Sequence, residues 1–391
     1  MGDSPRDKKI CEILCQETDG KSYKAHKYSL DTTQRPAIDY GDDELVWKKR
    51  AESLEYTKHR NLKEDADDIN RRGNQVLTYF LDGSRRVFKV DDQAYHDGKR
   101  SLIYPIVAGQ IAVGCCKRLD KKIYHEKFKQ EFVISVPRVA SASGRTGFFE
   151  AITQNLNDCQ LLKRLGVQFG AVLPYNTSAD GDKKVDFVDR GTAKIQDRMI
   201  ESEKKLVEEL VREGKLNQDN FLVKDGSLEY RLTDKEKKDG KARKTFKNNY
   251  EFVLGVSKSF NPEACIDSTK KPNPAFIADL PLYHRTPVAC FENQRTLGDV
   301  QFAVWYVRIR EQAKTRTPFD GILKIEKILA SPDEMIDSEL VDFLTAHIIN
   351  ERMPTCYGSD LRWANHLYPI FLTESFVKSK YLSTESFLNM F

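Results

Sequence analysis

From residue 75 onward, hydrophobic residues gather in runs that are separated by short polar segments. The runs at 75–81, 86–90, 102–117 and 127–137 are rich in β-branched and aromatic side chains, which favour strands over helices. Because the segments between these runs are short, the pattern predicts an antiparallel meander.

One long amphipathic helix is predicted after this meander, over residues 190–213. Its apolar residues recur at the 3.6-residue spacing of a helix, and Gly214 follows as a stop signal. These apolar positions are Ile195, Met199, Leu206, Val207 and Leu210. A shorter helix is predicted at about 148–164.

The second half of the chain alternates between strand-like and helical patterns. Short apolar runs predict four strands, of which the last two form a pair, at 220–223, 250–256, 299–310 and 321–328. Helical spacing predicts an amphipathic helix over 333–350 and a final helix from Tyr368 onward.

The start of the chain has a different character. Residues 1–45 are polar and weakly patterned, and residues 43–73 are highly charged with only sparse apolar positions. This pattern predicts an exposed helix that ends at Gly73. We therefore expect residues 1–73 to form a polar, helical extension to the domain that follows.

Composition narrows the class of protein. The 391 residues are 40% hydrophobic and 31% charged, with a formal net charge of +4, which is typical of a globular chain that buries a core. No apolar run is long enough for a transmembrane helix, and no apolar leader is visible, so we expect a cytoplasmic protein without membrane association. The eight cysteines form no CxxC pair, which predicts reduced thiols and no zinc site, with Cys115 and Cys116 in the core.

Positive charge is concentrated in one place. The segment Lys235–Lys247 contains seven basic and two acidic residues by its sequence, KEKKDGKARKTFK. It is either a solvated loop or part of a surface that faces phosphates.

The same tripeptide follows two of the predicted strands. Asp82-Gly83-Ser84 follows the first strand, and Asp225-Gly226-Ser227 follows the strand after the long helix. Gly and Ser after each aspartate favour a tight turn, so both carboxylates are expected at strand ends. A meander, a helix and a further strand in this order is the ribonuclease H arrangement, in which acidic residues on these elements converge on divalent metal. The fold prediction is therefore an α/β, RNase H-like mixed sheet flanked by helices.

The long helix offers two candidates for the acidic residue between these aspartates. With Met199 at the origin and 100° per residue, Glu203 falls at about 40°, within the apolar stripe, whereas Glu201 falls at about 200°. A carboxylate on a buried face is costly unless it is paired or binds metal. Glu203 is therefore the preferred metal ligand, although pairing with a basic side chain explains it equally simply, and Glu201 stays open.

These residues and their order resemble the NurA family of nucleases, which partner the HerA DNA translocase. The resemblance covers residues 75–391 and rests on both Asp-Gly-Ser motifs, the acidic residue on the long helix, and two further matches, Gly255-Val256-Ser257-Lys258 and Tyr368-Pro369. It implies a nuclease domain over 74–391 with insertions at about 138–190 and 261–300. It also implies that Asp82, Glu203 and Asp225 bind Mn²⁺ or Mg²⁺, as two ions, and that Lys258 is catalytic.

One position departs from the family pattern. The family places Asp or His on the C-terminal helix after its Tyr-Pro motif, and here Phe376 stands at about that position, with Glu374 two residues earlier. Either Glu374 replaces the missing ligand or the fourth ligand is absent. Lys258 would stabilise charge on the phosphate or be an ordinary surface lysine, and His366 would contact phosphate or be structural.

The expected function is a metal-dependent deoxyribonuclease. By resemblance it would be a homodimer that docks on a HerA-type hexameric ATPase, in DNA end processing or in anti-phage defence. Two alternatives remain open: a DNA-binding scaffold subunit that has lost the chemistry, and another RNase H-like nuclease.

Overall fold

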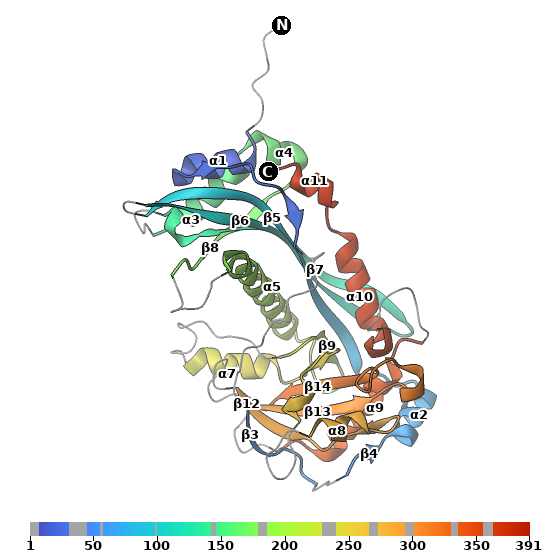
Figure 1. Ribbon diagram of the computed structural model, residues 1–391. Coiled ribbons are helices and arrows are strands. Elements are labelled where there is room, and N and C mark those ends of the chain that lie inside the picture. Colours follow the sequence, from blue (N-terminus) through green and yellow to red (C-terminus); the bar gives the residue numbers. More distant parts are fainter. Residues whose placement is uncertain are drawn as a thin grey trace.

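The computed structural model has the shape of a long curved sheet with helices on both of its faces (Figure 1). The residues that it describes are 8–30, 45–54, 58–97, 100–141, 146–178, 186–228, 240–265, 273–293, 301–329, 335–354 and 363–391. The fold class predicted from the sequence, mixed α/β, is confirmed.

Five strands form the centre of the sheet. β5 (Leu77–Asp97), β6 (Arg100–Leu119) and β7 (Lys122–Pro137) are long antiparallel neighbours, and β9 (Phe221–Asp225) and β10 (Val253–Ser257) follow on the other side of β5. β9 is parallel to both β5 and β10. The spatial order β7-β6-β5-β9-β10 is the arrangement expected for an RNase H-type sheet.

Further strands extend this centre at both ends. On the β10 side come the antiparallel strands β14 (Ile322–Ile328), β13 (Gln301–Arg308), β12 (Ala289–Asn293) and β3 (Leu45–Arg50). On the β7 side, β8 (Phe169–Tyr175) is parallel to β7. Short strands pair at the margins of the sheet: β1 (Lys21–Ser22), β2 (Tyr28–Ser29), β4 (Arg60–Asn61) and β11 (His284–Arg285).

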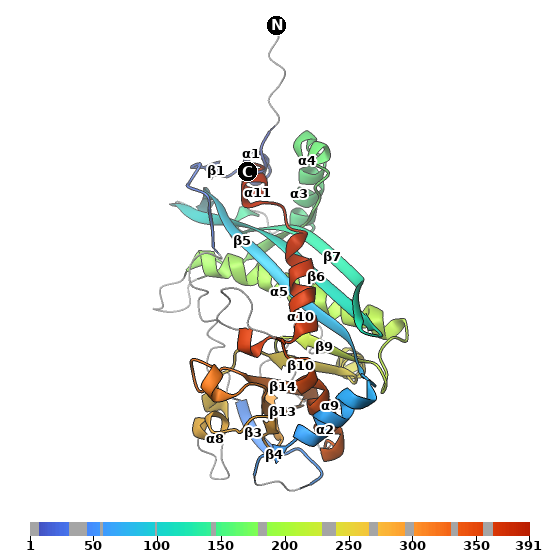
Figure 2. The same ribbon diagram turned by 90° about the vertical axis from the view of Figure 1, so that its right-hand side faces the viewer.

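Two helices lie on opposite faces of the long strands. Figures 1 and 2 show α5 (Phe187–Arg212) on one face and α10 (Tyr368–Ser379) on the other. α9 (Ser338–Asn350) and α2 (Lys63–Arg72) pack together at the β13–β14 end of the sheet. The other helices in the described ranges are α1 (Ile10–Thr18), α3 (Phe148–Asn157), α4 (Gln160–Leu165), α7 (Gly240–Asn249), α8 (Pro274–Ala278) and α11 (Thr384–Leu388).

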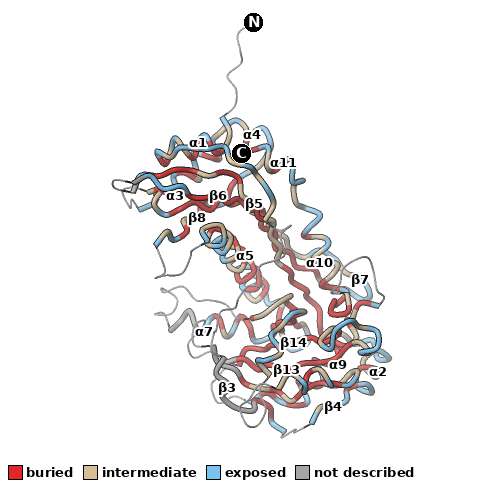
Figure 3. Tube along the Cα trace, viewed as in Figure 1, coloured by how far each residue is buried: buried red, intermediate tan, exposed pale blue. Residues whose placement is uncertain are grey.

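Each face of the sheet has its own hydrophobic core, and Figure 3 shows burial running along the long strands. The core under α5 includes the predicted stripe residues Ile195, Met199, Leu206, Val207 and Leu210, all buried. The core on the other face includes residues of α9 and α10. Cys115 and Cys116 are buried in β6, as predicted, and no described helix is long and apolar enough to cross a membrane.

Three local predictions were wrong. Asp82-Gly83-Ser84 is not a turn, because β5 continues through it and pairs there with Gly114, Val113 and Ala112 of β6. Residues 43–73 are not a single helix: β3 and β4 precede α2, since pairing with β12 and β11 overrides the local charge pattern. The helix predicted at about 148–164 is interrupted at Asp158–Cys159, where α3 ends and α4 begins.

A buried ion-pair network joins the N-terminal segment to the sheet. Arg285 in β11 is fully buried, and its guanidinium donates to Glu52 Oε2 at 2.9 Å and to Asp342 Oδ1 at 2.6 Å. Glu52 also accepts from the Val288 backbone N–H at 2.9 Å. Through Glu52, this network of ion pairs therefore links the segment before Gly73 to β11 and α9.

We predict that Arg285→Met lowers the free energy of unfolding by about 3–5 kcal/mol, because it leaves buried Glu52 without the cation that it pairs with and removes one of the two cations, Arg285 and Arg60, that pair with Asp342. Urea denaturation followed by circular dichroism measures the change. Arg71→Met is the matched control, because Arg71 forms an exposed pair with Asp68 and should change stability by less than about 1 kcal/mol. Equal effects of the two substitutions would contradict the structural role given to Arg285.

Candidate metal centre

Asp82 lies in the middle of β5, where it pairs with Gly114 of β6. The next residue, Gly83, faces α5, because a Cβ added to it would lie 2.2 Å from Glu203 Oε1. Successive side chains of a strand point to opposite faces of the sheet, so Asp82 projects toward α10. Its side chain is only 5% exposed.

Asp225 is the last residue of β9 and lies next to β5, because the two strands pair in parallel up to Leu81 and Lys224. The chain then turns at Gly226, whose φ of +91° is accessible to glycine and strained for other residues. The Lys224 ammonium donates to the carbonyl oxygens of Asp225 and Ser227 at 3.0 and 3.1 Å. This local network fixes the main chain that carries the Asp225 carboxylate.

The buried carboxylate of Glu326, in β14, binds the turn that follows Asp225. Glu326 is 1% exposed, and its Oε2 accepts from the Leu228 backbone N–H at 2.7 Å and from Ser227 Oγ at 2.8 Å. Lys324 forms an ion pair with it at 2.5 Å. Burial raises the pKa of Glu326, but Lys324 and these hydrogen bonds outweigh it and lower the pKa below the usual value.

Helix α10 brings a third carboxylate to the two aspartates. Its buried residues Ile370, Thr373 and Val377 face the sheet, and Thr373 Oγ1 donates to the Phe80 carbonyl at 3.5 Å. Glu374 follows Thr373 on the same side of the helix. Each of Asp82, Asp225 and Glu374 offers a carboxylate oxygen within 4.8 Å of the other two.

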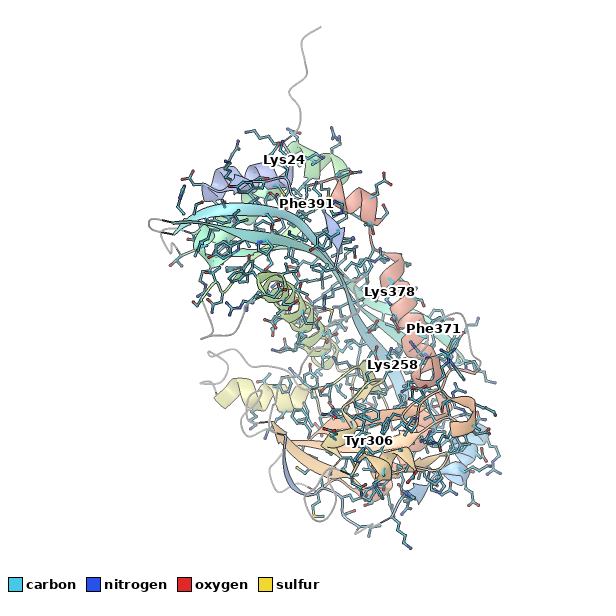
Figure 4. The ribbon with its side chains drawn as sticks, in the orientation of Figure 1. Lys24, Lys258, Tyr306, Phe371, Lys378 and Phe391 are labelled. Carbon is cyan, nitrogen blue, oxygen red and sulfur yellow. The ribbon has the colours of Figure 1, made fainter. Side chains whose placement is uncertain are left out.

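A lysine lies against this group. Lys258 follows the end of β10, and its ammonium is 2.8 Å from Asp225 Oδ2 and 3.6 Å from Glu374 Oε2. Asn365 donates from Nδ2 to the Lys258 carbonyl at 3.0 Å and thereby holds its backbone. Figure 4 shows Lys258 beside the start of α10 and Lys378 further along that helix; Lys378 pairs with the other oxygen of Glu374.

Burial and charge act differently on the pKa values of Asp82, Glu374 and Lys258. Burial and the neighbouring charge of Asp225 raise the pKa of Asp82 well above its usual range, although Lys258 opposes them. Burial also works against ionised Glu374, but Lys258 and Lys378 lower its pKa to about 2. Burial alone would lower the pKa of Lys258, but Asp225 and Glu374 raise it above the usual value. The lysine therefore keeps its charge.

These acids have oxygen atoms to spare for a cation. Within the described part of the chain, no hydrogen bond or ion pair reaches the Asp82 carboxylate, and buried Glu374 Oε2 has no hydrogen-bond partner. An unpartnered buried carboxylate is costly, and carboxylate oxygens are the ligands that Mg²⁺ and Mn²⁺ prefer. The donor set therefore fits a hard divalent cation held by Asp82, Asp225 and Glu374.

The structure brings together only some of the residues predicted from the sequence. Asp82, Asp225 and Lys258 meet, whereas Glu203 is in an ion pair with Lys224 at 3.2 Å on the α5 face. The metal-ligand role of Glu203 stays a prediction; burial raises its pKa, although Lys224 opposes this. Glu201 pairs with Lys204 at 2.8 Å, outside the group of three acids.

The sequence left two alternatives for the missing ligand on the C-terminal helix: replacement by Glu374, or absence. In the structure, Glu374 lies with the two aspartates. A signal for it existed, because Glu374 is four residues after Ile370 and three before Val377, within the buried stripe of α10. Phe376 lies outside the acidic group and stacks on His125, with ring centroids 3.4 Å apart. His366 is 2% exposed and lies close enough to lower the pKa of Glu374. Residues 235–239 of the basic segment lie outside the described part, and from Gly240 the segment is helix α7.

The fold of the chain has a low similarity to that of a solved nuclease. No protein-family model and no curated protein sequence matches the chain. Among solved structures, the crystal structure of the NurA nuclease from Sulfolobus solfataricus is similar over 84% of this chain and 88% of that chain, with a TM-score of 0.38 and 11% sequence identity. This similarity is too low to show the family or the activity of the chain.

We predict that Asp82→Asn stabilises the protein when metal is removed with EDTA. Near neutral pH the free energy of unfolding should rise, because burial and the charge of Asp225 oppose the ionised form of Asp82 in the folded protein and not in the unfolded chain. The folded-state pKa of Asp82 is raised, so the folded protein binds a proton more tightly than the unfolded chain. The gain should therefore shrink as pH falls through the folded pKa, and chemical denaturation between pH 7 and pH 5 measures it. A less stable variant in EDTA at pH 7 would contradict the buried, unpartnered state of Asp82.

Proposed function

We propose that the protein is a metal-dependent nuclease that hydrolyses phosphodiester bonds in DNA. The observation that carries the proposal is the group of three carboxylates within 4.8 Å of one another, with Lys258 against it. Two of these acids lie on adjacent central strands of an RNase H-type sheet, and the third comes from a helix that packs on it. Such a constellation suits the binding of a divalent cation and, with it, a phosphodiester.

Each residue has a role that follows from its position. Asp82, Asp225 and Glu374 would hold a divalent cation, Mn²⁺ or Mg²⁺, which when bound polarises a phosphoryl oxygen and lowers the pKa of an attacking water. Lys258 faces the same space, and its ammonium would stabilise the negative charge that develops on the phosphate. Lys224 and Glu326 hold the Asp225 turn from behind and keep the carboxylate in position.

The substrate, assembled form, partner and location that we propose are supported by the resemblance of the sequence to the NurA family. We infer DNA as substrate, a homodimer as the assembled form, a HerA-type hexameric ATPase as partner and a cytoplasmic location. The process would be DNA end processing or anti-phage defence. Co-purification with such an ATPase and the mass of the free protein in solution test these parts separately from the chemistry.

The alternative of an inactive scaffold subunit has less support than a nuclease. It rests on Phe376, whose ring packs against His125, whereas Glu374 lies with the two aspartates and supports a metal-binding site. The described residues at the site include acids, a charged lysine and buried carboxylate oxygen without a hydrogen-bond partner. An arrangement that costs folding energy is typical of a functional site.

We predict that Asp82→Asn and Asp225→Asn each reduce cleavage at least about 10³-fold, because each removes a charged ligand of the cation. The assay is cleavage of fluorescently labelled DNA with Mn²⁺, and EDTA should abolish the activity of the unmodified protein. Asp197→Asn is the matched control, since Asp197 is an exposed acid on α5, and it should cut as well as the unmodified protein. Full activity of Asp82→Asn, or activity that persists in EDTA, would refute the proposed chemistry.

A further inference from the structure

The charges around the candidate metal centre bear on how many cations it holds. The sequence resemblance implies two ions. Two ions at such a site lie about 4 Å apart and share carboxylate ligands, so a second ion needs ligands and space beside the first. The positions of Lys258 and Glu203 decide whether such ligands and such space exist.

Lys258 occupies the space between two of the three acids. Its ammonium is 2.8 Å from Asp225 Oδ2 and 3.6 Å from Glu374 Oε2, and its side chain is only 9% exposed. An ion that bound both of these carboxylates on this side would lie within a few ångströms of the ammonium, where like charges repel strongly. The lysine therefore stands where a second cation would bridge them.

Among the residues that the structure describes, no fourth carboxylate joins the three acids on this side of the sheet. Glu203 lies against Gly83, on the face opposite to Asp82, and its ion pair with Lys224 is almost fully buried, with side chains 4% and 6% exposed. Glu326 is likewise occupied by Lys324 and by the turn that it holds. Separating either buried pair leaves an uncompensated charge, which costs several kcal/mol.

The local charges favour a single divalent ion. Three acids face the centre, and Lys258 and Lys378 pair with them, which leaves one net negative charge. One divalent ion makes the centre singly positive, which complements the single charge of a phosphodiester. Two ions would leave three positive charges on a site that is mostly buried, which is electrostatically costly.

We propose that the centre binds one divalent ion, and that the Lys258 ammonium takes the place of the second. This inference rests on the proposed function. In this arrangement the ion and Lys258 act from two sides on the same phosphate, and the lysine stabilises charge that a second ion stabilises in two-ion nucleases. The class of site is thus a single hard cation paired with a fixed ammonium.

The test counts bound Mn²⁺ in the full-length protein without DNA. The protein is stripped with EDTA and titrated with Mn²⁺, and the free ion is measured from its six-line electron paramagnetic resonance signal. Frozen-solution spectra of the bound form separate an isolated ion from an exchange-coupled pair. We expect one ion per chain and the spectrum of an isolated ion.

Three variants test the part played by the lysine. Lys258→Met removes the charge at similar length and should let a second Mn²⁺ bind at least about tenfold more tightly, with a coupled spectrum. Lys258→Arg keeps the charge and should restore the count of one. Lys380→Met is the control, because Lys380 lies over the Phe376 ring and away from the acids, and it should also bind one ion. Circular dichroism confirms that each variant is folded.

The outcomes separate this inference from the function on which it rests. Two coupled ions in the unmodified protein would overturn the inference and leave the nuclease proposal standing. One ion both before and after Lys258→Met would overturn the role of the lysine. No binding at millimolar Mn²⁺ would overturn the inference together with the metal-dependent nuclease.

Discussion

Three like-charged side chains are held close together in a place that water hardly reaches, and much of the surrounding structure serves to keep them there. Asp82, Asp225 and Glu374 come from a long strand, a short strand and a C-terminal helix, and their oxygens lie within 4.8 Å of one another. Their mutual repulsion opposes this arrangement. The packing of α10 on β5 and the pairing of β5 with β9 overcome it.

The sheet separates two kinds of buried charge. On the α5 face, Glu203 pairs with Lys224 and Glu326 pairs with Lys324, so the charges are balanced and serve to hold the turn after β9. On the α10 face, no hydrogen bond or ion pair from a described residue reaches the Asp82 carboxylate, and the three acids there outnumber Lys258 and Lys378. Balanced charge supports the framework, and unbalanced charge is left for a ligand. The side of the strand on which an acid lies thus decides its use.

The segment before Gly73 and the C-terminal helices pack into the same folded unit as the central sheet. β3 extends the sheet beside β12, and Glu52 joins Arg285 and Asp342 in a buried network. α10 supplies Glu374 and, through Lys378, part of the charge that lowers its pKa to about 2. The centre therefore depends on residues that are more than 290 positions apart in the chain, and their approach is a property of the whole sheet.

The sequence by itself determined the long helix and the order of the strand-like runs along the chain, because local periodicity follows from nearby residues. Its Asp-Gly-Ser motifs, together with the family resemblance, indicated Asp82, Asp225 and Lys258 as candidates. It did not determine that β5 runs on through Asp82, since an Asp-Gly-Ser motif favours a turn until long-range pairing with β6 overrides it. The stripe on α5 marked Glu203 as buried, but only the tertiary structure showed Lys224 against it and β5 between it and Asp82. Glu374 likewise became a member of the group only when α10 packed on the sheet, because contacts between distant segments are decided by packing and leave little trace in local sequence.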